Sequence, residues 1–174
     1  MSIRHPVLML CIAAFVLFGV STGIADDADQ AASVSEEGGK HVDADGYPTF
    51  NIEEDGTVDW YTFSGYRRYH SDCHVCHGPD GEGSTYAPPL VQSMRDIDYP
   101  TFLSIVAEGR QSTVGGRASV MPGFGDNKNV YCYLDDLYVY LRARAVGDLP
   151  RGRPAKRADK PQQAAEQEES CMSG

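Results

Sequence analysis

Two cysteines and a histidine stand close together in the segment Cys73-His74-Val75-Cys76-His77. This spacing is the pattern for covalent attachment of c-type haem. The two thiols add to the two vinyl groups of one porphyrin, and the adjacent imidazole is then held under the ring to ligate the iron. We therefore expect one covalent haem c, attached through Cys73 and Cys76, with His77 as its proximal ligand.

Other uses of a closely spaced cysteine pair explain this segment less well. A thioredoxin-like dithiol needs a βαβ setting, which the sequence does not predict. A zinc site needs a second matched pair, whereas Cys132 and Cys171 are 39 residues apart. A plain structural disulfide would leave His77 without a role. Haem attachment is the interpretation that uses all three side chains.

An iron bound by one histidine has a second axial position on the opposite face of the haem, and its ligand has to be identified. The candidate ligands are Met94, Met121, Met172, His41, His70 and His74. Met121 lies 44 residues after His77, between glycine-rich turns, and Pro122 stiffens this loop. A core position suits Met94 better, and the attachment loop keeps His74 away from the opposite haem face. We therefore predict that Met121 is the distal ligand.

This predicted ligand set bears directly on activity. Histidine and methionine fill both axial positions and raise the reduction potential. Because no position stays open for oxygen, peroxide or a substrate, we expect electron transfer by the cofactor and no enzymatic catalysis. One alternative is a haem-based ligand sensor, in which a gas displaces Met121. Another is an obligate cytochrome subunit of a dehydrogenase complex.

Residues 1–25 have the pattern of a secretory signal peptide. A basic start at Arg4 precedes an apolar run over Val7–Val20, and small residues precede the expected cleavage after Ala25. A membrane anchor is the alternative, but the run is shorter than the roughly 17–25 residues that span a bilayer. We therefore expect a periplasmic protein with no membrane span after signal removal, in a compartment where thiols become oxidised.

Charge is distributed unevenly along the chain. The 174 residues include 25 acidic and 15 basic side chains, and the net charge of −10 argues against nucleic acid as a partner. Residues 26–59 hold 11 acidic side chains and one lysine. Residues 26–46 also have almost no large apolar side chains, so we expect a disordered acidic arm there. Residues 148–174 form a similar charged tail, which leaves residues 47–147 as the haem domain.

Capping residues and apolar periodicity predict a small all-α domain. A first helix is expected from Trp60, capped by Asp59, and a shorter helix is expected over Tyr99–Glu108. Residues 78–89 are rich in glycine and proline and are expected to form a loop. Asn129 is expected to cap the last helix. No stretch alternates convincingly between apolar and polar residues as a strand would.

The last helix has the clearest pattern. Its apolar stripe consists of Leu134, Leu137, Tyr138 and Leu141. The helix is expected to end near Gly147. Asp135 and Asp136 are expected on its solvated face.

The motif and helices resemble the class I c-type cytochromes over about Trp60–Arg144. In that family a glycine and an aromatic residue of the first helix cross the last helix, and Gly65 and Tyr69 match them. The matching residues of the last helix are Leu137, Tyr140 and Leu141. The family's proline, whose carbonyl accepts the N–H of the ligand histidine, corresponds to Pro88, and Leu90 belongs to the same haem-binding segment.

A narrower resemblance rests on residues 59–61, 65–70 and 131–136, which are similar to those of four-cysteine c-type cytochromes of methanol metabolism in methylotrophic bacteria. It implies a periplasmic carrier that accepts electrons from a PQQ-dependent quinoprotein methanol or alcohol dehydrogenase and passes them to another cytochrome or a terminal oxidase. It also implies a disulfide between Cys132 and Cys171. The alternative is that Cys132 is unpaired and Cys171 forms a disulfide with another molecule. We expect a monomer.

Overall fold

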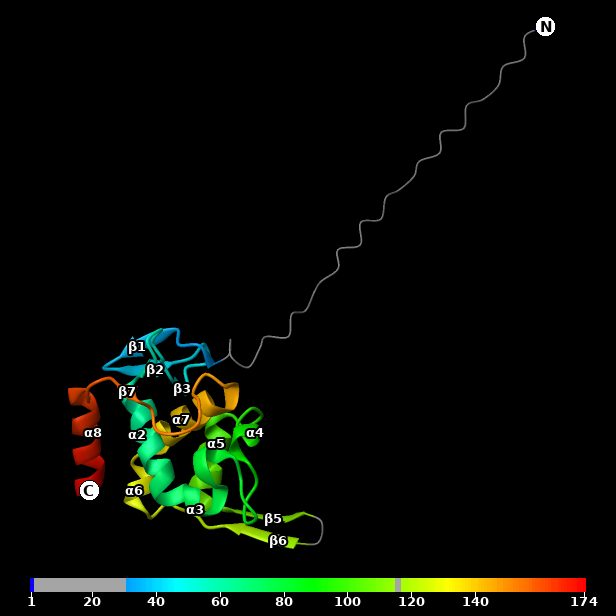
Figure 1. The fold of residues 1–174 in the computed structure, drawn as a ribbon, viewed down its shortest axis with the longest axis vertical. Helices are drawn as coiled ribbons and strands as arrows, with labels where there is room; N and C mark the ends of the chain where they lie inside the picture. Colours follow the sequence, from blue (N-terminus) through cyan, green and yellow to red (C-terminus); the bar gives the residue numbers. More distant parts are fainter. Residues whose placement is uncertain (2–30, 115–116) are drawn as a thin grey trace.

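The computed structural model describes Met1, residues 31–114 and residues 117–174 (Figure 1). The signal peptide expected over residues 1–25 therefore lies outside the described residues, apart from Met1. Along the chain the elements are β1 (Ser35–Glu37), β2 (Lys40–Val42), β3 (Pro48–Thr49), β4 (Thr57–Val58), α2 (Trp60–Arg68), the π-helical turn η1 (Tyr69–Cys73), α3 (His74–His77), the 3₁₀ turn η2 (Pro79–Gly81), α4 (Leu90–Ser93), α5 (Tyr99–Glu108), β5 (Arg110–Val114), β6 (Arg117–Met121), α6 (Lys128–Tyr131), α7 (Leu134–Val146), β7 (Lys156–Arg157) and α8 (Gln162–Ser173). In the described part of the chain, no helix is long and apolar enough to cross a membrane.

Helices α2 and α7 cross at the centre of the molecule, at Gly65 (Figure 1). A Cβ at Gly65 would lie 1.9 Å from the carbonyl oxygen of Asp136 and 2.7 Å from Cβ of Tyr140. No larger residue fits there, since these distances are far below van der Waals contact. The rings of Tyr69 and Tyr140 pack beside the crossing with centroids 5.5 Å apart. This is the helix crossing that the resemblance implies for Gly65 and Tyr69.

The predicted start of the first helix and the predicted bounds of the shorter helix are confirmed. The side chain of Asp59 accepts a hydrogen bond from the backbone N–H of Thr62 at 2.9 Å, so Asp59 caps α2 as predicted. Helix α5 covers Tyr99–Glu108 and ends at Gly109, as predicted.

The predicted start of the last helix is wrong. Asn127 caps the short helix α6, and its side chain accepts a hydrogen bond from the N–H of Asn129 at 3.0 Å. The long helix α7 begins separately at Leu134 and ends at Gly147, which has a φ of 94°. Asn127 and Asn129 are both suitable capping residues, and the local backbone conformation decides which of them caps the helix.

The helical core is as expected, but the prediction that no segment forms a strand is wrong. Seven short strands form three small sheets among the described residues, in the orders β1-β2-β3, β4-β7 and β5-β6. The strands are two to five residues long. The strands of two or three residues are too short to show an alternating pattern, and their pairing partners rather than their own sequence define them.

Part of the segment predicted to be a disordered acidic arm forms strands that pair with the rest of the domain. Residues 26–30 lie outside the described residues, but β1 and β2 form a hairpin that pairs with β3, in the register Glu36 with His41 and His41 with Thr49. Lys40 of this hairpin forms an ion pair with Asp135 of α7 at 2.7 Å. The segment contributes little apolar burial of its own, and backbone hydrogen bonds and this ion pair attach it to the helical core.

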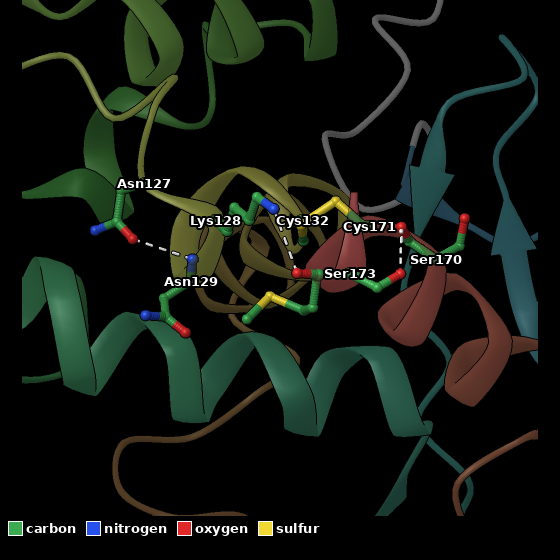
Figure 2. Close-up of a disulfide and its surroundings, with 8 residues drawn as sticks. Asn127, Lys128, Asn129, Cys132, Ser170, Cys171 and Ser173 are labelled. Atoms are coloured by element: carbon green, nitrogen blue, oxygen red, sulfur yellow. Dashed lines mark hydrogen bonds between the residues drawn. A yellow bond between two sulfur atoms is a disulfide. The ribbon is translucent and has the colours of Figure 1, made fainter.

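The charged tail is also attached to the domain. Strand β7 pairs in parallel with β4, and the guanidinium of Arg157 lies 5.1 Å from the ring centroids of Trp60 and of Phe63. A disulfide joins Cys132, at the end of α6, to Cys171 of α8 (Figure 2). The tail is therefore bound across α2, and the disulfide that the resemblance implies is present.

The prediction that Asp135 and Asp136 lie on a solvated face of the last helix is wrong for Asp136. Its side chain is only 8% exposed, and burial raises its pKa to about 7, against the effect of a hydrogen bond from Ser64. Asp135 is engaged as well, because the hydroxyl of Tyr99 donates to it in addition to Lys40. The hairpin β1-β2 and helix α2 cover this part of α7, which periodicity within α7 alone does not indicate.

Replacing Asp136 with asparagine is expected to flatten the pH dependence of stability. Between about pH 4 and pH 7 folded Asp136 keeps a proton that the unfolded chain has released, so wild-type stability falls as the pH rises through this window. The loss is at most about 1.4 kcal/mol per pH unit. Urea unfolding of both proteins at several pH values within this window measures the two slopes. Equal slopes would show that Asp136 ionises normally in the folded protein.

Candidate haem-attachment site

The motif Cys73–His77 closes one continuous helical run. Helix α2 passes through the π-helical turn η1 into α3, and His77 is the last helical residue before Gly78, whose φ is 72°. A π-helical turn inserts an extra residue into the helix and is frequent at functional sites. The run thus presents both cysteines and the histidine within two turns, directly after the crossing with α7.

The two cysteines are available for a covalent bond to a cofactor. Neither Cys73 nor Cys76 is in a disulfide; Cys73 is half-buried and Cys76 is exposed. Burial raises the pKa of the Cys73 thiol to about 12, and the neighbouring Asp72 and Cys76 act in the same direction. A thioredoxin-like dithiol needs a lowered pKa, so this environment does not favour the redox-dithiol interpretation.

His77 is held in the form that can ligate a metal. Its side chain is buried, and its Nδ1 lies 3.1 Å from the carbonyl oxygen of Pro88, so Nδ1–H donates to that carbonyl. Burial lowers the pKa of His77, against the smaller effect of this hydrogen bond, and the ring is neutral at pH 7. Nε2 makes no hydrogen bond to the described part of the chain. A neutral imidazole with Nδ1–H bound to a carbonyl presents Nε2 as the metal ligand.

These donors fit haem c better than a bare metal ion. Across residues 31–114 and 117–174, no group of three or more histidine, cysteine, aspartate or glutamate side chains is arranged to hold a metal ion. Cys132 and Cys171 are consumed by their disulfide, so they cannot complete a zinc site with the motif. Two unpaired thiols and one oriented imidazole match the covalent and axial bonds of haem c, which supplies a redox-active iron when bound.

Met121 lies on a strand rather than in the expected glycine-rich loop. It is the last residue of β6 and pairs with Arg110 of β5. The side chain is half-buried and packs against the hydrophobic core. A Cβ at Gly109 would lie 2.6 Å from the carbonyl oxygen of Met121, so the chain leaves α5 close beside it. In Figure 1 the β5-β6 hairpin and α3 lie at the same end of the molecule.

Two of the other candidates for the distal position, Met94 and His70, are engaged elsewhere. Met94 is 1% exposed in the core, as expected for a packing methionine, and its carbonyl accepts from Arg142. His70 uses Nδ1 toward the carbonyl of Tyr66, and its Nε2 lies 3.5 Å from Asp80. The remaining candidates lie on other elements: Met172 is exposed on α8, His41 is on β2 and His74 is inside the motif.

In and beside the loop after His77 lie two buried charged residues, Asp80 and Arg144, that the sequence analysis missed. The predicted loop 78–89 is interrupted only by the short turn η2, and Leu90, half-buried against the core, begins α4. Buried Arg144 of α7 and buried Asp80 contact each other in this region. The sequence did contain an indication of this contact, namely an arginine within an apolar helix. A buried charge requires partners, so such an arginine predicts a polar contact nearby.

The fold and these residues define a class of protein. A small helical domain, with a Cys-x-x-Cys-His segment closing its first helix and its last helix crossing at a glycine, is built to hold a covalent haem through one histidine.

Known proteins identify the family. The chain is 59% identical over 138 residues to cytochrome c-553I of Paracoccus denitrificans, covering 79% of this chain and 61% of that protein. It is 36% identical over 100 residues to cytochrome c-555 of Methylococcus capsulatus, covering 57% of this chain and 75% of that protein. The crystal structure of the c-type cytochrome XoxG from Methylobacterium extorquens AM1 matches with a TM-score of 0.79 and 55% identity, over 83% of this chain and 89% of that one.

A scan against protein-family models finds no match. The relatives are sufficient, and the chain belongs to the class I c-type cytochromes of the methanol-related kind. Proteins of this family carry covalently bound haem c and transfer electrons, and they are not enzymes. The chain spans about 61% of the length of cytochrome c-553I.

Proposed function

We propose that this protein is a monohaem electron carrier, with thioether bonds from Cys73 and Cys76, His77 as proximal ligand and Met121 as distal ligand. The observation that carries the proposal is the environment of His77, whose Nδ1 is bound to the carbonyl of Pro88 while Nε2 is left for the iron. The burial of Met94 in the core and the contacts of His70 with Tyr66 and Asp80 support Met121. Two protein ligands leave the iron closed to substrates, which suits outer-sphere electron transfer.

The proposed location is the periplasm, with the protein acting as a monomer. The signal-like residues 1–25 support export. The disulfide between Cys132 and Cys171 supports an oxidising compartment, since such bonds rarely persist in the cytosol of mesophiles. The same compartment is where haem c would be attached to Cys73 and Cys76.

The proposed electron donor is a PQQ-dependent quinoprotein methanol or alcohol dehydrogenase, and the acceptor is a further cytochrome or a terminal oxidase. The methanol-related kind of cytochrome to which the chain belongs supports this assignment. The acidic β1-β2 hairpin lies at the opposite end of Figure 1 from α3, and residues 60–147 hold nine acidic and eight basic side chains. The domain over residues 60–147 is therefore nearly neutral as a whole apart from the propionates, and we expect apolar contacts to dominate docking at the haem end.

Stopped-flow reduction tests the proposed donor. Oxidised holoprotein is mixed with a purified quinoprotein alcohol dehydrogenase and its alcohol, and haem reduction is followed over a range of salt concentrations. We expect a rate that rises with cytochrome concentration and changes little with salt. A glucose-oxidising quinoprotein serves as the control donor. Equally slow reduction by both donors would contradict the assigned partner, and a steep fall with salt would contradict the neutral docking face.

A further inference from the structure

The chain reverses sharply between His77 and Pro88. Gly78, Gly81 and Gly83 all have positive φ values, of 72°, 79° and 83°. Asp80 has a φ of 57° and is the one non-glycine residue with a positive φ in the described part of the chain. This conformation costs a non-glycine residue on the order of 1 kcal/mol, so other contacts must hold the segment in place.

The hydroxyl of Tyr69 holds the first part of this segment. It donates to the carbonyl of Gly78 at 2.6 Å and accepts from the N–H of Gly81 at 3.0 Å. The side chain of Tyr69 is fully buried beside the crossing of α2 and α7. One hydroxyl group on the first helix thus bridges both ends of the turn η2.

Arg144 holds the next part from the opposite helix. Its Nε donates to the carbonyl of Asp80 at 3.2 Å, and its Nη2 donates to Oε1 of Glu82 at 2.7 Å. Its Nη1 donates to the carbonyl of Leu149, which follows α7. The arginine is buried, and its planar group makes three directed bonds that a lysine cannot reproduce.

Short hydrogen bonds connect the held segment to the proximal histidine. The N–H of Gly83 donates to the carbonyl of His77 at 2.8 Å. The hydroxyl of Ser84 donates to the carbonyl of Cys76, and the N–H of Ser84 donates to the carbonyl of Ala87 at 3.0 Å. The next carbonyl along the chain, that of Pro88, accepts from Nδ1 of His77.

We propose that Tyr69 and Arg144 are positioning residues that hold residues 78–88 so that the carbonyl of Pro88 polarises the imidazole of His77. The inference rests on the proposed role of His77 as the proximal ligand. A firm bond at Nδ1–H increases the electron donation of Nε2, which favours ferric over ferrous iron. Loosening the segment weakens this bond and raises the reduction potential. In the described part of the chain neither side chain makes a hydrogen bond to His77, so both act through the segment.

Two variants that leave the charge unchanged test this role. Arg144→Lys removes the directed bonds but keeps the positive charge, and Tyr69→Phe removes both hydroxyl contacts. In each holoprotein we expect the Nδ1–H proton of His77, followed by NMR in the ferrous state, to exchange with solvent faster by at least about tenfold. We also expect a higher midpoint potential. Arg142→Lys is the matched control, because buried Arg142 on the same helix bonds the carbonyl of Met94 instead.

Three results would overturn the proposal. The first is that both variants keep the proton exchange rate and the midpoint potential of the wild type. Another is equal acceleration in Arg142→Lys, which would indicate general loosening of the protein. If Arg144→Lys does not fold, an unchanged Tyr69→Phe alone overturns it. Both readouts use the isolated holoprotein, so failure to accept electrons from a dehydrogenase would contradict the proposed partner and leave this inference standing.

Discussion

Replacing Met121 with leucine is expected to lower the midpoint potential of the haem by on the order of 0.1 V. A thioether stabilises ferrous iron, and leucine has a similar volume but no ligand atom. The vacated axial position should then bind carbon monoxide in the ferrous state without denaturant. Spectroelectrochemical titration measures the potential, and the visible spectrum under carbon monoxide reports the open position. The half-buried strand position of Met121 makes the substitution tolerable for the fold.

Met94→Leu is the matched control for this substitution. Met94 is buried in the core, so the same chemical change there should leave both the potential and the resistance to carbon monoxide as in the wild type. A Met121→Leu protein with an unchanged potential would show that another residue is the distal ligand. Carbon monoxide binding by the ferrous wild type would instead favour a haem-based ligand sensor.

The largest effect on stability is expected for Gly65→Ala. The added methyl group would lie 1.9 Å from the carbonyl oxygen of Asp136, so α2 and α7 must move apart. Overpacking of this kind costs about 2–3 kcal/mol, because neither neighbouring atom is the end of a flexible side chain. The melting temperature should fall by roughly 5–10 °C. Thermal unfolding followed by circular dichroism measures this directly.

Gly147→Ala separates this clash from the ordinary cost of losing a glycine. Gly147 has a φ of 94° at the end of α7, and no atom lies within 4 Å of an added Cβ. Its replacement should cost only about 1 kcal/mol, for the left-handed backbone. A smaller loss at Gly65 than at Gly147 would show that the helix crossing is looser than the structure indicates.

Much of the site is predictable because its signals are local. The motif Cys73–His77 and the cap at Asp59 depend on residues within one or two helical turns. The bounds of α5 follow from its cap and from Gly109 in the same way. Gly65, Tyr69 and Pro88 came from family resemblance, and the crossing and the hydrogen bond at His77 agree with it.

The remaining features depend on residues far apart in the sequence. The ion pair of Lys40 with Asp135 spans 95 residues, and the contact of Arg144 with Asp80 spans 64. Periodicity within one helix predicts only one buried stripe, so it placed Asp136 in solvent although a second layer covers that face. The acidic arm and the charged tail likewise have too little apolar content to predict order.

The sequence by itself therefore determined the cofactor chemistry and the principal helices, because covalent spacing, capping and periodicity act over a few residues. The tertiary structure decided which polar side chains are buried, where the terminal segments attach and what holds the loop beside His77. The physical reason is that a buried polar group is stable only when its partners surround it, and those partners come from distant parts of the chain.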